Sequence, residues 1–278
     1  MRSLNTSAGG QESRSRRYPI VVEPNALLQE IAKKQVKVVD VRKAEEYSQD
    51  HILGAVSIPL ANILNADSLE KVAEVYGNAG IDDNIHSVVY DDTFGALAAR
   101  VAWTLEYIGH PNVSLLAVTY STWKSMGLEV ESETAVYPKV KHSLKVNNDI
   151  LATADYVNSC IEQDGKVVLD SRERLNYLDH HIPKAINMPW KTFSGENSIL
   201  RSAEELRRIV QNRGINDGQE VITYCGSVGT LSGLAYYALH LAGYRNVKLY
   251  AKSLKEWKSM GLPTEVVKDA NYWDLSAG

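Results

Sequence analysis

Short runs of β-branched residues recur along the chain and alternate with segments of helical periodicity. The runs VKVVDV, from Val36, and KVVLD, from Lys166, are apolar almost throughout, and so are HSVVYD, from His86, and EVITYC, from Glu220. Such runs are typical of strands that are buried on both faces of a parallel sheet. We therefore expect four central strands, distributed over both halves of the chain.

The segments between these runs carry helix signals. In SAEELRRIVQNRG, Ser202 is a candidate N-cap, Glu205 completes a capping box and Gly214 ends the helix. The segment LSGLAYYALHLAG predicts a second, apolar helix that ends at Gly243. Alternating strands and helices predict the α/β class, with open, mostly parallel sheets covered by helices on both faces.

The two halves of the chain also repeat each other. Six identical residues recur at an offset of 130: Asp40 and Asp170, Arg42 and Arg172, Tyr47 and Tyr177, His51 and His181, Ala55 and Ala185, and Pro59 and Pro189. Further on the offset becomes 134, with Tyr90 and Tyr224, Gly95 and Gly229, and Trp123 and Trp257 among the pairs. Two constant offsets predict two homologous domains, residues 20–133 and 145–270, with a linker at 134–144 between them. Residues 1–19 are then an arm and residues 271–278 a tail.

Composition excludes several classes of function. Hydrophobic residues make up 44% and charged residues 23% of the chain, and its formal net charge is −4, so nucleic acid is not an expected partner. No apolar run approaches the ~20 residues that span a bilayer, so we expect no membrane association. The Ser- and Arg-rich arm lacks the apolar stretch of a signal peptide, and we expect it to be disordered. A cytoplasmic location is favoured, and a periplasmic one would require a signal peptide that has been removed.

Two cysteines are too few for a disulfide framework, and neither has metal-ligand spacing around it. Cys160 lies in a predicted helix that Thr153 caps, which favours a buried, inert thiol. The chain has no Walker loop and no dinucleotide fingerprint. We therefore expect no metal, flavin or nucleotide cofactor.

The other cysteine directly follows a predicted strand and opens a loop of small residues, the Cys225 loop: Cys225, Gly226, Ser227, Val228, Gly229 and Thr230. Such a loop can turn successive backbone amides toward one point and so bind an anion in front of a helix. An anion-binding loop lowers the pKa of a thiol and would stabilise a persulfide. The alternative is an inert cysteine whose glycines only serve the turn. Asp91 stands at the matching position of the first half, so the turn itself does not require cysteine.

These features resemble the tandem-domain rhodaneses, which include thiosulfate and 3-mercaptopyruvate sulfurtransferases. Asp40-Val41-Arg42 with DHILGA, and Asp170-Ser171-Arg172 with HHIPKA, are similar to the strand end and turn that open each domain of that family. The resemblance implies a nucleophilic Cys225, a loop from Gly226 to Thr230 that binds substrate and persulfide, and an inactive first domain. It also implies sulfur transfer from a small-molecule donor to a thiol or to cyanide, without a cofactor.

The sequence departs from the family in the charges expected near the donor. Gly226 and Ser227, directly after Cys225, carry no charge, Asn176 replaces an arginine, the insertion that brings a second arginine is absent, and Val228 and Gly229 are exchanged. Ala251-Lys252-Ser253 stands where the family usually has Asp-Gly-Gly or Asp-Gly-Ser. Lys252 is a candidate for the missing positive charge, and the alternative is a solvated surface lysine. Arg172 either orients a donor or the Cys225 loop, or forms a structural pair with Asp170. His51 and His181 are interpreted as turn residues.

Two other functions are compatible with a reactive Cys225. The first is a sulfur-relay or sensing module that delivers persulfide sulfur to a protein partner, and the missing arginine favours it. The second is a phosphatase related by fold, which would need an arginine at the end of the loop, where Thr230 and Leu231 stand. We therefore expect a sulfurtransferase, with the relay as its alternative.

Overall fold

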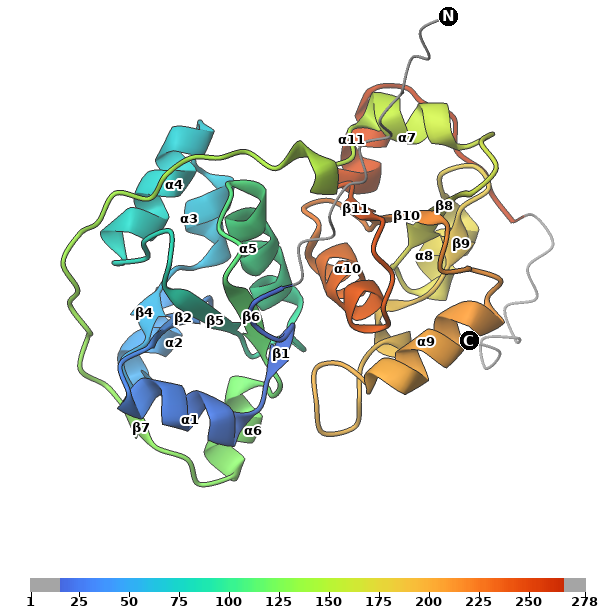
Figure 1. Ribbon diagram of the computed structural model, residues 1–278. Coiled ribbons are helices and arrows are strands. Elements are labelled where there is room, and N and C mark those ends of the chain that lie inside the picture. Colours follow the sequence, from blue (N-terminus) through green and yellow to red (C-terminus); the bar gives the residue numbers. More distant parts are fainter. Residues whose placement is uncertain (1–15, 268–278) are drawn as a thin grey trace, which may run out of the picture.

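The computed structural model describes residues 16–267, which form two similar α/β units (Figure 1). The first unit is built on a five-stranded parallel sheet with the order β1-β6-β5-β2-β4. Its strands are β1 (Val21–Val22), β2 (Val36–Asp40), β4 (Val56–Ser57), β5 (His86–Tyr90) and β6 (Val113–Leu116). A separate antiparallel pair consists of β3 (His51–Ile52) and β7 (Val130–Glu131).

Helices cover both faces of this sheet (Figure 1). On one face α1 (Pro24–Ala32), α2 (Ala44–Gln49) and α6 (Tyr120–Ser125) bury Leu27, Tyr47 and Trp123 in a common cluster. The other face is covered by α3 (Leu60–Leu64), α4 (Leu69–Asn78) and α5 (Ala96–Tyr107).

The second unit repeats this plan on a four-stranded parallel sheet with the order β11-β10-β8-β9. Its strands are β8 (Lys166–Asp170), β9 (Ile186–Asn187), β10 (Glu220–Tyr224) and β11 (Val247–Leu249). Its helices are α7 (Ala154–Cys160), α8 (Arg174–Asp179), α9 (Ala203–Asn212), α10 (Thr230–Leu241) and α11 (Ser253–Ser259), with the 3-10 turns η1 (Asn148–Ile150) and η2 (Trp190–Thr192). Ser202 and Glu205 form the expected capping box. The predicted fold class is confirmed.

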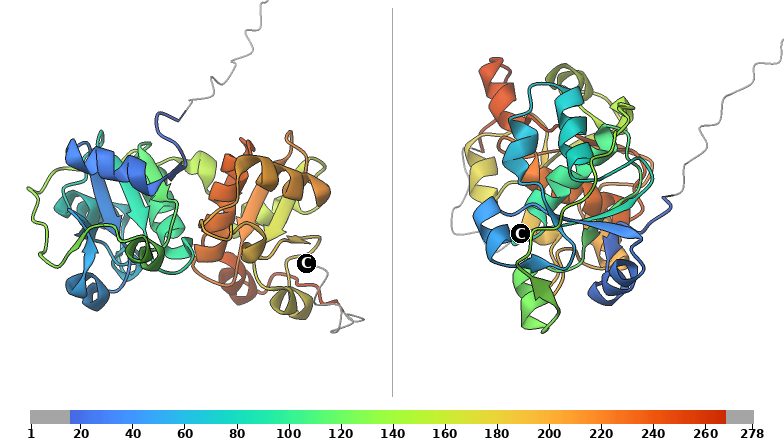
Figure 2. Two further views of the ribbon diagram at one scale, coloured as in Figure 1. Left: turned by 90° about the horizontal axis from the view of Figure 1, so that it is seen from below. Right: turned by 90° about the vertical axis from the view of Figure 1, so that its left-hand side faces the viewer.

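The two units meet along α5 and α10 (Figures 1 and 2). Buried side chains from both helices, among them Trp103 and Tyr236, belong to one continuous hydrophobic cluster. The two ends of the interface are closed by other contacts, such as the Phe94 ring against Trp190 at 4.7 Å between centroids. Since α5 and α10 each follow a strand-end loop, those loops are brought next to the neighbouring unit.

The expected linker lies against the first unit (Figure 1). The Tyr137 hydroxyl donates to the carbonyl of Gly54 at 2.8 Å, and the Val140 amide donates to the carbonyl of Gly77 at 3.0 Å. The Lys145 amide donates to the carbonyl of Ile108 at 2.9 Å. These bonds fix residues 137–145 to the surface of the first unit.

Part of the expected arm also lies against the first unit. Arg16 pairs with Glu106 at 2.5 Å, and Tyr18 stacks on His86 at 3.8 Å between ring centroids. The expectation of disorder is therefore wrong for residues 16–19, because their side chains find polar and aromatic partners. Residues 1–15 and the tail at 271–278 lie outside the described residues. Between residues 16 and 267, no helix is long and apolar enough to cross a membrane.

Candidate active site

Cys225 lies at the carboxyl end of β10, and its loop leads directly into α10. Gly229 closes the loop with a left-handed backbone, φ 75°, as Gly95 does in the matching turn of the first unit, φ 82°. A glycine is favoured at such a φ because it has no Cβ to clash. The two turns share this glycine but differ just before it, because Phe94 has φ 61° and the equivalent Val228 has no positive φ. The Cys225 side chain is 3% exposed.

The matching turn of the first unit binds the carboxylate of Asp91. One carboxylate oxygen of Asp91 accepts hydrogen bonds from the amides of Thr93 at 2.9 Å and Gly95 at 2.8 Å. The other accepts from Leu97 at 2.7 Å and Ala98 at 3.0 Å. Burial raises the pKa of Asp91 and these four amides oppose that rise. Four convergent donors around two oxygens form an anion nest.

At the offset of 134, the same four amides in the second unit belong to Ser227, Gly229, Leu231 and Ser232. Cys225 takes the place of Asp91 but has no carboxylate to occupy the nest. No backbone carbonyl in residues 16–267 accepts a hydrogen bond from these four amides. In the second unit the amides of Ser227 and Ser232 lie close enough to the Cys225 sulfur to favour its anion.

The surroundings of the thiol favour its ionised form. Burial would by itself raise the pKa of Cys225. The polar hydrogens of Ser232, of the Ser227 amide and of the Ser253 hydroxyl lie near the sulfur and outweigh burial, so the pKa lies below its usual value. The Ser232 hydroxyl is buried and has no hydrogen-bond partner within the described part of the chain, so its proton is free to turn toward the sulfur.

Ser253, at the start of α11, touches the cysteine from the other side. Its hydroxyl accepts from the Cys225 amide at 3.1 Å, and its single proton is within reach of both the Tyr250 carbonyl at 2.9 Å and the Cys225 sulfur at 3.7 Å. Ser253 has φ 57°, a conformation that is costly for a residue with a side chain. The matching Thr119 has an ordinary φ of −70°. Backbone strain at this point accompanies a hydroxyl directed at the nucleophile.

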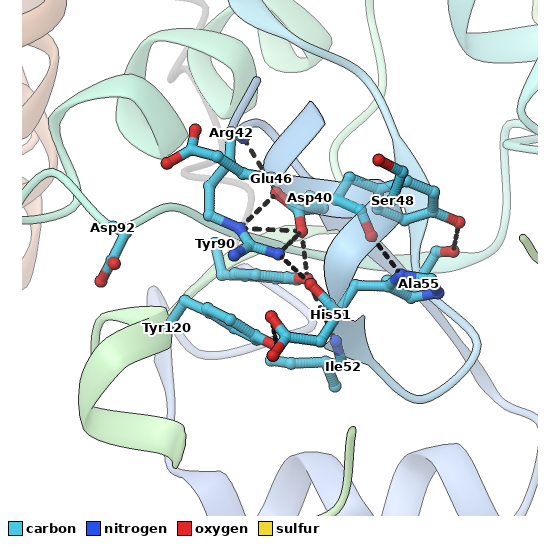
Figure 3. A network of polar contacts seen from close by, with 12 residues as sticks. Asp40, Arg42, Glu46, Ser48, His51, Ile52, Ala55, Tyr90, Asp92 and Tyr120 are labelled. Carbon is cyan, nitrogen blue, oxygen red and sulfur yellow. Dashed lines mark hydrogen bonds and ion pairs between the residues drawn. The ribbon is translucent and has the colours of Figure 1, made fainter. Parts of the chain in front are cut away.

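A buried arginine fork occurs in both units, and Figure 3 shows the one in the first. Arg42 donates through Nε and Nη2 to the carboxylate of Asp40, at 2.7 Å for the shortest bond, and through Nη2 to the carbonyl of Asp50 at 2.6 Å. The Tyr90 hydroxyl donates to the same carboxylate at 2.5 Å. This network joins the end of β2 to the following turn.

Arg172 makes the same bonds in the second unit. It donates to Asp170 at 2.5 Å and to the carbonyl of His180 at 2.6 Å, and the Tyr224 hydroxyl donates to Asp170 at 2.6 Å. Because Arg42 forms this network where no cysteine exists, the pair of Arg172 with Asp170 is structural. Of the two interpretations of Arg172, the geometry favours the structural pair.

The two turn histidines bind their own turns. Nδ1 of His51 lies 2.8 Å from the carbonyl oxygen of Tyr47, and Nδ1 of His181 lies 2.8 Å from that of Tyr177. Each ring stacks on that tyrosine at 3.9 Å between centroids. Both therefore act as turn residues in the structure.

A cavity of about 370 Å³ lies over the Cys225 loop. Its lining residues are Arg172, Glu173, Asn176, Gly226, Leu231, Leu254, Lys255 and Lys258. Lys191 lies 3.2 Å from Glu173 and so offsets its charge. Neither Lys255 nor Lys258 is within 4.0 Å of a carboxylate in residues 16–267. The cavity therefore has an excess of positive charge.

Lys252 is placed differently from these two lysines. Its side chain is 77% exposed, its ammonium lies 2.8 Å from the Glu256 carboxylate, and it is not among the residues that line the cavity. Lys255 and Lys258 stand three residues apart on one face of α11, the spacing that aligns side chains on a helix. The positive charge expected from Lys252 is thus carried at the cavity by its two neighbours.

Comparison with known proteins gives this architecture a family. Residues 23–126 and 153–260 each match the family model of the rhodanese-like domain. The chain belongs to the rhodanese family. The two matched segments correspond to the two α/β units, so this is a rhodanese with two domains, as its internal repeat predicted.

Named relatives of this rhodanese are sulfurtransferases. The thiosulfate sulfurtransferase of Pseudomonas aeruginosa is 27% identical over 86% of this chain and 94% of its own length. A Schizosaccharomyces pombe protein named "Probable 3-mercaptopyruvate sulfurtransferase" is 29% identical over 69% of each chain. The crystal structure of Escherichia coli SseA, titled as a 3-mercaptopyruvate sulfotransferase, superposes with a TM-score of 0.77 and 24% identity, covering 85% of this chain and 99% of that one. Function as a sulfurtransferase enzyme follows.

Sequence reasoning missed three polar contributors to the site of this rhodanese. The departure from the family at Ala251-Lys252 drew attention to this segment, but it gave no sign that the Ser253 hydroxyl contacts the cysteine. If the start of the helix had been known from the sequence, the three-residue spacing of Lys255 and Lys258 would have placed both on one helix face. No group of three or more His, Cys, Asp or Glu side chains within residues 16–267 could hold a metal ion.

Proposed function

We propose that this rhodanese moves a sulfane sulfur from thiosulfate or 3-mercaptopyruvate to a thiol or to cyanide through a persulfide on Cys225. The observation that carries the proposal is that the amides of Ser227 and Ser232, equivalent to two of the four that bind the Asp91 carboxylate in the first domain, lie beside the sulfur of Cys225 in the second. The loop residues Gly226, Ser227, Val228, Gly229 and Thr230 then hold the persulfide.

In the first half-reaction the Cys225 thiolate attacks the outer sulfur of the donor. A sulfur–sulfur bond forms to Cys225, the bond between the outer sulfur and the rest of the donor breaks, and its electron pair leaves with sulfite or with the pyruvate enolate. With thiosulfate the terminal sulfur of the persulfide keeps one negative charge, and with mercaptopyruvate it does so once the thiol proton has passed to the leaving enolate, which becomes pyruvate. The amides of the nest stabilise that charge as it forms, because they are already oriented toward it.

In the second half-reaction an acceptor thiolate or cyanide attacks the terminal sulfur. The sulfur–sulfur bond breaks, the acceptor keeps the transferred sulfur, and the electron pair of the broken bond returns to Cys225 as a thiolate. Each step starts from an anion, so no general base is needed, which fits histidines that are committed to turn carbonyls.

We propose that the donor binds in the cavity over the loop, with its anionic end toward Lys255 and Lys258. The cavity has room for a small anion, and its two lysines have no carboxylate partner in the described part of the chain. Arg172 lines the same cavity but is held by Asp170. Lys252 then has no direct role in binding. We also propose that residues 20–133 form a domain without a nucleophile of its own, because Asp91 fills its nest.

Intact-mass measurement after exposure to each donor tests the proposal. The parent protein and Cys160→Ser should each gain one sulfur atom that cyanide removes, whereas Cys225→Ser should gain none and should have no turnover. Turnover by a folded Cys225→Ser protein would refute the mechanism. If the persulfide forms but small acceptors do not remove its sulfur, the function is delivery of that sulfur to a protein thiol.

A further inference from the structure

A side chain of the first domain, that of Arg100 on α5, reaches the Cys225 loop. Its Nε donates to the carbonyl of Val228 at 2.7 Å, across the domain interface. A Cβ at Gly229 would lie 3.4 Å from Cδ of Arg100 and 3.1 Å from the backbone of Ala251. Arg100 and Ala251 therefore hold the loop between them, and Gly229 leaves the space that this requires.

The charge of Arg100 is not neutralised by a carboxylate. Its other hydrogen bond is to the hydroxyl of Thr104, one turn along α5, and its guanidinium lies 5.1 Å from the ring of Trp103. No carboxylate is within ion-pair distance of it in residues 16–267. Burial lowers the pKa of Arg100, whereas negative charge on Tyr76 or Cys225 would raise it. A half-buried cation without a carboxylate partner is unfavourable for folding and is therefore expected to serve function.

The internal repeat provides a control for this arginine. The residue 134 positions after Arg100 is Leu234, which is fully buried in α10. The second domain therefore offers an apolar side chain where the first offers a cation. The positive charge faces the loop that has the cysteine, and no matching charge faces the loop that Asp91 fills.

We propose that Arg100 is a positioning residue for sulfur transfer: it fixes the carbonyl of Val228 and places a positive charge beside the anion nest of Cys225. The proposal rests on the proposed function and extends it, because the domain without a nucleophile completes the site of the other. Removing Arg100 should then harm the chemistry of the cysteine rather than the binding of the donor.

Three variants in a Cys160→Ala background separate the two roles. Arg100→Met keeps bulk and loses both charge and donor, Arg100→Gln keeps a donor, and Arg100→Lys keeps the charge. The exposed Arg208→Met on α9 is the control. The alkylation rate of Cys225 against pH, the kcat and Michaelis constant for thiosulfate, and the melting temperature are measured for each.

For Arg100→Met and Arg100→Gln we expect the alkylation pKa to rise by about one unit, as for loss of an opposite charge at short range. For Arg100→Lys we expect it to stay near the parent value. The kcat should fall about tenfold or more in Arg100→Met, with less than a twofold change in the Michaelis constant and no loss of melting temperature. Arg208→Met should match the parent in every measurement.

An alkylation pKa and kcat that stay at parent values in a folded Arg100→Met protein would overturn the proposal. If that variant does not fold, equal alkylation pKa values in Arg100→Lys and Arg100→Gln would overturn it as well. Both outcomes differ from failure of the proposed function, in which the parent protein itself would form no persulfide.

Discussion

Neutralising the two cavity lysines should weaken the binding of anionic donors without altering the nucleophile. The perturbation is the double variant Lys255→Gln and Lys258→Gln, which keeps side-chain length and removes both charges. Lys252→Gln is the matched control, because Lys252 lies one turn away and pairs with Glu256 outside the cavity. All three lysines are exposed, so we expect each variant to fold.

The magnitude follows from Coulomb interactions in a water-filled cavity. At a separation of about 6 Å, one ammonium stabilises a unit negative charge by about 0.7 kcal/mol in water. For each lysine this corresponds to about a threefold change in the Michaelis constant for a monoanion, and about tenfold for a dianion. Thiosulfate carries two charges and mercaptopyruvate one at its carboxylate. Loss of each lysine should therefore affect thiosulfate more.

Steady-state assays with both donors and with cyanide as acceptor measure this difference. In the double variant the Michaelis constant for thiosulfate should rise by a larger factor than that for mercaptopyruvate, with kcat nearly unchanged. Salt should reduce the effect, since the screening length falls from about 10 Å at 0.1 M to about 3 Å at 1 M. The reasoning is refuted if Lys252→Gln raises the Michaelis constant as much as the double variant, or if the two donors are affected equally.

Three further predictions concern the nucleophile and its loop. Alkylation of Cys225 should speed up with pH and level off above an inflection that lies below the ~8.5 of a free thiol, and an inflection above that value would contradict the nest. Ser253→Ala and Ser253→Gly should both raise that inflection. In chemical denaturation the glycine variant should be more stable than the alanine variant by about 1 kcal/mol, because only glycine relieves the strain at φ 57°. Gly229→Ala should reduce kcat strongly, because its Cβ meets the backbone of Ala251, whereas Gly214→Ala, which has open space at φ 78°, should reduce stability alone. Equal kcat values for the two glycine variants would remove the case for a precisely held loop.

The sequence predicted those features that local pattern and repetition determine. Two constant offsets were enough to define two similar units, and the β-branched runs became β2, β5, β8 and β10. The repeat also located the nucleophile, since Cys225 and Asp91 occupy equivalent positions. These inferences need only residues that are close in the chain or related by the offset.

Contacts between distant residues could not be predicted in this way. Arg100 and Val228 are 128 positions apart and meet only because α5 packs against α10. In a helix Arg100 is an ordinary residue, and no motif distinguishes it from other arginines. Lys252 was preferred over Lys255 for its place in a departing motif, but the start of α11 at Ser253 directs the two later lysines to the cavity.

The equivalent positions in the two domains show what the shared turn does and does not determine. In the first domain a covalently attached carboxylate occupies four amides of the turn, and in the second the equivalent amides of Ser227 and Ser232 lie beside the cysteine sulfur. The sulfur of a cysteine extends less far into the turn than the carboxylate of an aspartate, so these donors remain for a second sulfur. The turn thus determines that an anion is held, and the side chain determines whether that anion can leave. Arg100 adds charge only where the anion is transferable, which accounts for a cation in α5 where α10 has Leu234.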